Sequence, residues 1–326
     1  MDPLSDVLRV VRLDGAYFYA VEATEPWSVR AVPAKELTPR LLPQAEHLIS
    51  YHVLTSGRCW GGVYGEEQVE MEPGDVIVFP HGDAHLMSSR PGLDLEGDDY
   101  GTTPERYPHT VYIGSGGRTA ATFVCGFLGC DQRPFNPLLA TLPRRLHVRG
   151  LSQGWLSLFA RQVVEESRAD RAGADTVLTR LAELMFIEVL RRHLETITPE
   201  QRGWLAGLRD PMVGKALGLL HARPAHAWTL DELAREVSSS RSKFAERFTW
   251  LVGEPPMQYL AKWRMQLAAN RLAQGSEKVA AVASAVGYES EAAFSRAFKK
   301  ATGVSPAAWR QVRRELTPGA SSPGAP

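Results

Sequence analysis

The chain has 326 residues, of which 44% are hydrophobic and 23% are charged, and its formal net charge is zero. These values are typical of a globular protein of two or three domains, and they exclude collagen-like, disulfide-rich and wholly disordered chains. No run of about 18 apolar residues predicts a membrane span, and the first ten residues lack the pattern of a signal peptide.

Charge and cysteine content indicate a partner and a compartment. From residue 211 onward the chain holds 16 Lys+Arg against 9 Asp+Glu, whereas the first 210 residues hold 21 against 28. A basic final third favours a polyanionic partner, although ordinary surface variation would give the same imbalance. The three cysteines form no CxxC pair and no disulfide framework, which predicts a reducing cytoplasm.

Short β-strands are predicted in the N-terminal part. After a β-like run at Ala16–Ala20, four aromatic or β-branched runs lie between residues 48 and 82, separated by Gly and Pro. Pro73-Gly74-Asp75 is a tight-turn signal between two of them. Residues 90–110 are rich in Gly, Asp and Pro and predict a surface loop, and residues 111–129 return to the strand pattern. Many short strands favour a sandwich or barrel over a parallel sheet.

The hydrophobic period becomes helical after Pro143. Residues 154–168 and 175–197 carry Leu, Val, Phe and Met at helical spacing, and Pro199 ends the second run. Helical patterns then continue to residue 314, and the final residues have the composition of a disordered tail. The domains expected from these changes are residues 1–145, 150–200, 210–314 and 315–326.

The helical part contains two copies of one pattern. Five residues of the first copy recur 50 positions later in the second. The pairs are Phe244 and Phe294, Phe248 and Phe298, Gly253 and Gly303, Pro256 and Pro306, and Tyr259 and Trp309. Upstream, Ala234 and Val237 match Ala283 and Val286 at an offset of 49, so the turn of the second copy has one extra residue.

Each copy has the parts of a helix-turn-helix motif: a short first helix, a polar turn, and a second helix with a serine at its start. The first helices are predicted over Asp231–Val237 and Val279–Val286. Ser240 and Ser290 are expected to cap the second helices, because a serine oxygen accepts hydrogen bonds from the unpaired N–H groups of a first turn. The two phenylalanines of each copy are four residues apart, so they share one face and pack into the core.

The opposite face of each second helix is polar. It offers Ser242, Lys243, Ala245 and Glu246 in the first copy, and Glu291, Ala292, Ser295, Arg296 and Lys299 in the second. Short side chains would let such a helix enter a DNA major groove, where Arg296 can pair with guanine or a phosphate. A helix over Pro256–Gln274 would place the two second helices in successive grooves, about 34 Å apart. A plain helical bundle explains one copy equally well, but two copies in the most basic third favour DNA binding.

Residues 229–248, 253–272 and 282–310 resemble the DNA-binding domain of AraC/XylS-type bacterial transcription regulators. The resemblance covers Met212 to Arg314 and implies a domain that binds double-stranded promoter DNA and usually activates transcription, with RNA polymerase as a partner. By position, it implies groove-facing roles for Arg241, Ser242, Glu246, Ser290, Glu291, Ser295 and Arg296. The predicted DNA-binding set also includes Ser240, Lys243 and Lys299.

One departure from this family concerns the first motif. Ala245 and Glu246 stand where relatives often carry longer amide or basic side chains. The first motif is therefore expected to read DNA more weakly, or to read cytosine through the carboxylate of Glu246.

Residues 50–60, 69–87 and 125–143 resemble the cupin barrel that precedes the DNA-binding domain in one branch of the family, over residues 5–145. The matching pieces are Pro73-Gly74-Asp75, Pro80, Gly82 and His85. An apolar barrel with a few converging polar groups is the usual form of a small-molecule site. The candidate wall residues of such a site are His52, Arg58, Trp60, His85 and Cys125.

No cofactor is expected, because Ser50 interrupts the His-x-His of enzymatic cupins and no Glu follows at the expected spacing. His52, His81 and His85 remain candidate ligands for a divalent metal, with hydrogen-bonded polar liners as the alternative. Cys125 would act as an oxidant sensor if a neighbour such as Arg118 or Arg133 lowered its pKa; otherwise it is a small buried apolar residue.

The helices after residue 150 are either plain core or, as is common in regulators of this type, the dimer contact. The candidate dimer stripe is Leu178, Leu181, Met185 and Val189. The sequence thus predicts an α+β protein with a cupin-like sensor domain: a cytoplasmic, homodimeric, non-enzymatic activator controlled by a small-molecule or redox signal. The alternatives are a metal-dependent cupin enzyme fused to a DNA-binding domain, and a constitutive DNA-binding protein whose cupin senses nothing.

Overall fold

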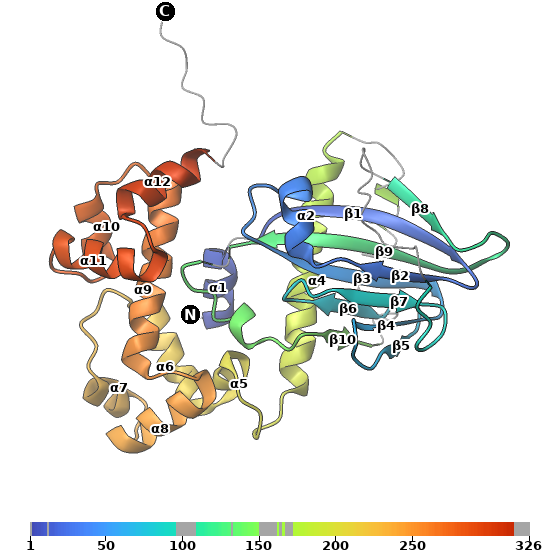
Figure 1. The fold of residues 1–326 in the computed structure, drawn as a ribbon. Helices are drawn as coiled ribbons and strands as arrows, with labels where there is room; N and C mark the ends of the chain where they lie inside the picture. Colours follow the sequence, from blue (N-terminus) through green and yellow to red (C-terminus); the bar gives the residue numbers. More distant parts are fainter. Residues whose placement is uncertain are drawn as a thin grey trace, which may run out of the picture. The chain divides into compact units, whose positions relative to one another are not determined.

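The computed structural model describes residues 2–11, 13–95, 109–131, 133–149, 162, 165–166 and 172–315. The described chain divides into a sheet unit, within residues 13–131 and 142–196, and a helical unit, within residues 1–12, 132–141 and 197–326 (Figure 1). Most of the predicted helix over residues 154–168 and of the predicted loop over 90–110 lies outside the described residues, as does nearly all of the predicted tail.

The strands of the sheet unit form two sheets (Figure 1). They are β1 (Leu13–Thr24), β2 (Ser28–Ala31), β3 (His47–Gly57), β4 (Cys59–Val63), β5 (Val69–Met71), β6 (Val76–Phe79), β7 (His85–Ser88), β8 (His109–Ile113), β9 (Thr119–Cys130) and β10 (Leu146–Val148). The larger sheet has the order β10-β6-β3-β9-β1-β8 and the smaller one β2-β7-β4-β5. Every pairing is antiparallel except that of β1 with β8. The strands predicted between residues 48 and 82 and over 111–129 are confirmed.

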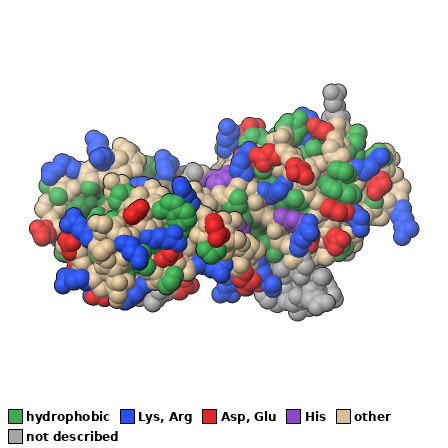
Figure 2. All heavy atoms as spheres, turned by 90° about the horizontal axis from the view of Figure 1, so that it is seen from below, with side chains coloured by type: hydrophobic (Ala, Val, Ile, Leu, Met, Phe, Trp, Pro, Cys, Tyr) green, Lys and Arg blue, Asp and Glu red, His purple; other side chains and the backbone are tan. Residues whose placement is uncertain are grey.

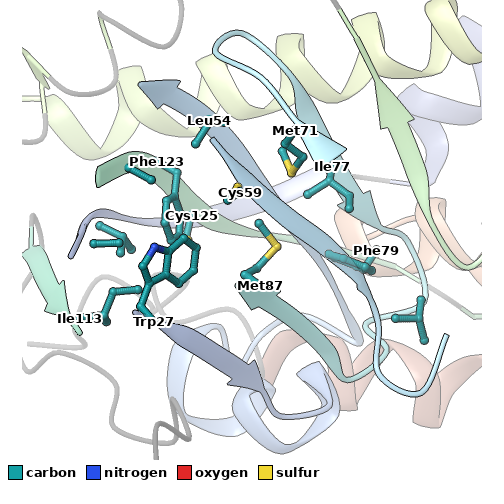
Figure 3. Packing of buried hydrophobic residues seen from close by; sticks show 14 residues of the cluster. Trp27, Leu54, Cys59, Met71, Ile77, Phe79, Met87, Ile113, Phe123 and Cys125 are labelled. Atoms are coloured by element: carbon teal, nitrogen blue, oxygen red, sulfur yellow. The ribbon is translucent and has the colours of Figure 1, made fainter. Parts of the chain in front are cut away.

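One apolar core contains residues from both sheets (Figure 3). Leu54, Ile77 and Phe123 enter it from the larger sheet, and Met71 and Met87 from the smaller one. Successive side chains of a strand point to opposite faces, so each strand contributes every second residue to the core. This alternation buries apolar area from two sheets at once, which is the main source of stability for such a unit.

The turn predicted at Pro73-Gly74-Asp75 connects β5 and β6. Gly74 has φ +94°, a conformation that glycine adopts without steric cost, and its N–H donates to the carbonyl of Leu54 at 2.8 Å. The buried carboxylate of Asp75 accepts a hydrogen bond from the Glu72 N–H at 3.1 Å and contacts Nε2 of His147 at the same distance. The turn is therefore held from both sides.

The sheet unit also contains helices α2 (Ala34–Leu41) and α4 (Ala174–Thr196), and α4 packs on β1, β9 and β10. Leu178, Met185 and Val189 are buried. Three of the four residues of the candidate dimer stripe therefore pack in the core rather than form an exposed dimer contact. Val177 and Leu184 lie elsewhere on α4 and are 41% and 50% exposed. No helix in the described part of the chain combines the length and hydrophobicity needed to cross a membrane.

The helical unit contains α1 (Pro3–Val11) and a 3-10 turn (Leu139–Thr141), followed by helices within residues 204–315. These helices are α5 (Trp204–Arg209), α6 (Pro211–Ala222), α7 (Leu230–Glu236), α8 (Arg241–Val252), α9 (Pro256–Gln274), α10 (Val279–Ala285), α11 (Glu291–Thr302) and α12 (Pro306–Glu315). The predicted linking helix Pro256–Gln274 is α9, with the same bounds.

Helix α1 belongs to the helical unit although it lies at the other end of the sequence. Asp2 accepts hydrogen bonds from the first N–H groups of α1, and Leu4, Val7 and Val11 are buried where α1 meets α6 and α9. At its far end, Nδ2 of Asn270 donates to the carbonyl of Val10 at 2.6 Å. An apolar stripe at helical spacing thus covers a surface of the helical unit.

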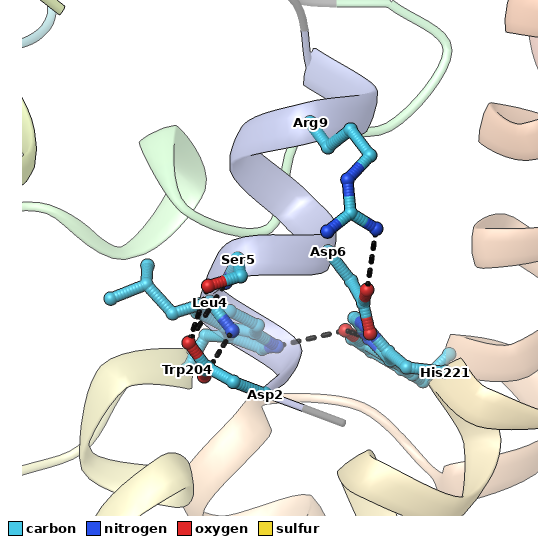
Figure 4. A network of polar contacts seen from close by, with 8 residues as sticks. Asp2, Leu4, Ser5, Asp6, Arg9, Trp204 and His221 are labelled. Atoms are coloured by element: carbon cyan, nitrogen blue, oxygen red, sulfur yellow. Dashed lines mark hydrogen bonds and ion pairs between the residues drawn. The ribbon is translucent and has the colours of Figure 1, made fainter.

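A chain of polar contacts lies under α1 (Figure 4). Nε1 of Trp204 donates to the hydroxyl of Tyr259 at 2.8 Å, and this hydroxyl donates to Nε2 of His221 at 2.7 Å. The second ring nitrogen of His221 then carries the proton and lies 3.9 Å from a carboxylate oxygen of Asp6. Burial lowers the pKa of His221 to about 3 and raises that of Asp6, so His221 is neutral.

The turn of the second motif requires glycine for two reasons. Gly287 has φ +83°, and a Cβ added to it would lie 2.6 Å from the carbonyl oxygen of Ala225. Gly303 has the same φ, but a Cβ there would meet nothing within 4 Å. The first motif has Ser238, with φ +54°, in its turn.

Gly287→Ala should therefore destabilise the protein more than Gly303→Ala. Both substitutions reduce the chain entropy of the unfolded state by the same amount, which stabilises the fold. Both also strain a left-handed residue, which destabilises it by more, so the net cost is about 1 kcal/mol each. Only Gly287→Ala adds a clash with backbone atoms, which should bring its cost to about 1–3 kcal/mol. Urea unfolding of the two variants measures the difference, and equal midpoints would contradict the close approach.

Candidate nucleic-acid interface

Helices α7 and α8 form the first helix-turn-helix motif, and α10 and α11 form the second. Both predicted caps are confirmed. The hydroxyl of Ser240 accepts from the N–H of Lys243 at 3.4 Å, and that of Ser290 accepts from the N–H of Ala293 at 3.0 Å. Four residues separate α7 from α8 and five separate α10 from α11, which agrees with the extra residue predicted in the second turn.

Buried aromatic side chains fix the second helix of each motif. Phe244 and Phe248 are fully buried with ring centroids 5.8 Å apart, and Phe248 meets Tyr259 of α9 edge-to-face at 5.9 Å. The second motif repeats this arrangement. Its distances are 5.5 Å between Phe294 and Phe298 and 5.9 Å between Phe298 and Trp309 of α12. The duplicated pattern in the sequence is therefore a duplicated aromatic core, and it holds α8 and α11 by one side only.

The opposite sides of α8 and α11, here called the polar faces, are open to solvent. Nine of the ten predicted DNA-binding residues are exposed, and the tenth, Ser295, is half-buried. The exposed residues are Ser240, Arg241, Ser242, Lys243, Glu246, Ser290, Glu291, Arg296 and Lys299. Figure 2 shows basic side chains interspersed with acidic ones on the surface that it presents.

The two polar faces differ in their charge pairing. In the first motif, Arg241 forms an ion pair with Asp231 at 3.3 Å, and Glu246 adds a negative charge. In the second motif, the side chains of Arg296 and Lys299 make no hydrogen bond or ion pair with the other described residues, whereas in the first motif this holds for the side chain of Lys243 but not for that of Arg241. Cations without an internal partner have the most electrostatic energy to gain from a polyanion, which favours the second motif as the stronger phosphate contact.

Two residues that support this interface were not among the predicted site residues. Asp210 accepts hydrogen bonds from the N–H groups of Met212 and Val213 at the start of α6, and binds Nε of Arg247 on α8 at 2.9 Å. Arg264 on α9 donates to backbone carbonyls in the loop before the first motif and in the turn of the second. Asp210 before Pro211 is a local helix-start signal, but the contacts of Asp210 with Arg247 and of Arg264 with these carbonyls join distant segments, which no local spacing rule could have found.

Three of the five candidate ligand-binding residues meet inside the sheet unit. Nδ1 of His52 lies 2.8 Å from Sγ of Cys125, and Nε2 of His52 lies 2.7 Å from Nε2 of His85. His85 Nδ1–H donates to the carbonyl of Asp83 at 2.9 Å, so its Nε2 accepts from His52, which in turn accepts from the Cys125 thiol. All three side chains are buried, and their polar groups satisfy one another.

This chain of contacts is neutral. Burial lowers the pKa of His85 to about 4 and holds that of His52 well below its ordinary value. Burial also raises the pKa of Cys125 far above that of a free thiol. The condition set for an oxidant sensor, a thiol pKa lowered by a neighbour, is not met in this structure.

The other candidates lie apart from this chain of contacts. Arg58 is exposed and pairs with Glu70 at 2.9 Å. Trp60 follows Cys59 on β4, so the strand alternation turns it away from the core that contains Cys59. His81 is exposed and donates to the carbonyl of Leu142 at 2.9 Å. Among the described residues, no three His, Cys, Asp or Glu side chains are grouped so as to hold a metal ion.

Comparison with known proteins decides the family. A family model described as Cupin matches residues 2–195, and one described as Helix-turn-helix domain matches residues 233–312. The chain is also 32% identical over 314 residues to an AraC-like transcription regulator of Streptomyces antibioticus, across 95% of this chain and 99% of the relative. The chain belongs to the AraC family of transcription regulators.

One further curated relative agrees with this assignment, and one solved structure is similar to part of the chain. The regulator is 27% identical to the RCS-specific HTH-type transcriptional activator RclR of Escherichia coli (strain K12), across 83% of this chain and 87% of the relative. It is 29% identical to the solved DNA-binding domain of AdpA in complex with a target DNA, across 33% of this chain and 97% of that one, with a TM-score of 0.32. The curated relatives are transcription regulators and not enzymes, which confirms the non-enzymatic assignment.

The buried histidines should make the stability of the sheet unit depend on pH. Since the pKa of His85 falls from 6.5 unfolded to about 4 folded, its contribution is complete above pH 6.5 and is lost as the pH falls toward 4. At pH 5 this contribution should be reduced by roughly 2 kcal/mol relative to pH 7.5. Urea unfolding at both pH values measures this change. The free energy of unfolding should fall less between pH 7.5 and pH 5 for His85→Gln than for wild type.

His81→Gln is the matched control, because His81 is exposed and lies outside the chain of contacts that joins His52, His85 and Cys125. Its pH effect should equal that of wild type. An unchanged pH effect in His85→Gln would show that His85 does not stay neutral as the fold requires.

Proposed function

We propose that the regulator is a cytoplasmic homodimer that activates transcription by reading promoter DNA with the polar faces of α8 and α11, under control of a small molecule bound in the sheet unit. The observation that carries the DNA-reading part is the repetition of one geometry. Each motif has a serine-capped helix, pinned on one side by a buried phenylalanine pair and open on the other. This is the arrangement by which a helix-turn-helix presents side chains to base edges.

The two motifs should contribute differently to recognition. Arg296 would pair with the O6 and N7 acceptors of guanine, and Lys299 would contact a phosphate. Glu246 on the first motif can accept from the amino group of cytosine, whereas Arg241 must first give up its ion pair with Asp231. The second motif would then supply most of the salt-dependent affinity, and the first would add selectivity.

Support for activation comes from one relative. The E. coli relative is a transcriptional activator by name and is similar over most of both chains. An activator bound next to a promoter must also contact RNA polymerase, so we include the polymerase among the partners.

The ligand site is proposed at His52, His85 and Cys125. These are polar groups in an otherwise apolar core, which is the usual composition of a small-molecule site. A ligand with a hydrogen-bonding group would replace one contact of this chain. The redox alternative has support in the RCS-specific name of the same relative, but the raised pKa of Cys125 argues against a reactive thiolate here.

The homodimer is proposed on the outward side of α4. Val177 and Leu184 expose apolar surface there, while Arg180 and Glu183, Glu188 and Arg192 form ion pairs along the same helix. Charges of both signs beside an apolar patch allow a second copy to pair with it in the antiparallel direction.

Arg296→Ala tests the DNA-reading role. The variant should bind duplexes selected by the wild-type chain from a random pool more weakly by about 1–3 kcal/mol, and should lose preference for guanine at one position. Arg90→Ala, which removes an exposed cation from the sheet unit, should bind as wild type does. Gel-shift titration at fixed salt measures both, and equal affinity of Arg296→Ala and wild type removes Arg296 from the contacts.

Leu184→Lys tests the homodimer. Placing a charge in a desolvated apolar contact should shift the full chain from dimer to monomer at micromolar concentration, because the burial cost of the ammonium exceeds the gain from association. Thr176→Lys adds the same charge at an exposed position of the same helix and should leave the dimer intact. Sedimentation equilibrium distinguishes them. A monomeric wild type, or a dimeric Leu184→Lys, contradicts this interface.

A further inference from the structure

Arg264 extends from α9, the helix that joins the two motifs, and its guanidinium contacts the loop that precedes the first motif and the turn of the second. Nε donates to the carbonyl of Pro224 at 2.7 Å, and Nη2 donates to that of His226 at 2.8 Å. Both carbonyls lie in the loop that leads from α6 into the first motif. Nη1 makes a longer contact of 3.5 Å with the carbonyl of Gly287, in the turn of the second motif.

The chemistry of this contact suits positioning rather than charge neutralisation. All three acceptors are neutral backbone carbonyls, and a planar guanidinium can address several at once because its N–H groups point in fixed directions. Burial lowers the pKa of Arg264 without removing its charge, since arginine stays protonated in proteins. Hydrogen bonds from a charged donor are stronger than those between neutral groups.

The same place brings the two backbones together directly. A Cβ on Gly287 would lie 2.8 Å from Cα of Ala225, so the loop and the turn approach without a side chain between them. The loop is itself braced, because Nε1 of Trp228 donates to the carbonyl of Arg223 at 3.1 Å and the Arg223 guanidinium lies 4.4 Å from the Trp228 ring. We call Arg264, Pro224, Ala225, His226 and Gly287 the motif junction.

We propose that Arg264 is a positioning residue for DNA recognition, an inference that rests on the proposed DNA-reading function. Through the motif junction it holds α8 and α11 in one relative arrangement. Two second helices that enter successive major grooves must match the helical repeat of DNA, so a fixed arrangement demands one spacing between the two contacted sites. Without the junction, the two motifs would be related through α9, on which both of them pack, and more than one spacing would be accepted.

The test uses the full chain and duplexes that wild type selects from a random pool, each also made with one base pair inserted between its two footprints. Wild type should lose about fivefold or more in affinity on insertion. Arg264→Met should bind the parent duplex more weakly, and its loss on insertion should shrink to about twofold because its motifs can readjust. Arg271→Met removes an arginine on the same helix whose side chain, among the described residues, pairs with Glu277 alone, and it should behave as wild type.

Arg264→Lys separates positioning from charge, because an ammonium keeps the charge but cannot address three carbonyls from one plane. Its loss of affinity on insertion of the base pair should be as small as that of Arg264→Met. An insertion loss equal to that of wild type in both variants overturns the proposal, even if their affinity for the parent duplex falls.

Hydrogen exchange of the DNA-free chain supplies a second readout that also covers poorly folding variants. Peptides spanning residues 223–228 and 284–290 should exchange faster in Arg264→Met than in wild type, and those of the sheet unit should not change. Unchanged exchange in both peptides overturns the junction. A wild-type chain that selects no duplex overturns the DNA-reading function, and the recognition role of Arg264 with it.

Discussion

A buried aromatic pair on one side of a short helix is the constraint on which the DNA-binding geometry depends. Phe244 with Phe248, and Phe294 with Phe298, commit one face of α8 and α11 to the core, and an aromatic ring from the next helix closes each cluster. A helix of three turns cannot turn about its axis once two rings four residues apart are buried. The polar faces are therefore exposed because the opposite faces are occupied, and this holds for both motifs.

Orientation of each helix does not by itself relate one motif to the other. That relation comes from α9, from Arg264 and from the close approach of Gly287 to Ala225. The junction is made of backbone carbonyls and a glycine, so it constrains the path of the chain and leaves the side chains of the polar faces free to vary.

The sheet unit uses polar groups in a different way. His52, His85 and Cys125 lie in a core of Leu, Ile, Phe and Met, where each would be costly alone. They are tolerated because the thiol, the two imidazoles and one carbonyl form an ordered series of donors and acceptors in which every group is neutral. Only one arrangement of protons satisfies every donor and acceptor in this series. Adding a charge, or replacing one of these residues, therefore destabilises the sheet unit.

The sequence alone determined the elements that depend on neighbours within a few residues: the serine caps, the paired phenylalanines, the extra residue of the second turn, the bounds of α9 and most strands. Caps and i, i+4 pairs are local, so their signals survive in a single sequence. Only the tertiary structure decided that α1 packs with Asn270, 260 residues away, that Arg264 joins the motifs, and that Trp60 turns away from His52. Those contacts depend on which surfaces meet after folding, and no spacing along the chain encodes that choice.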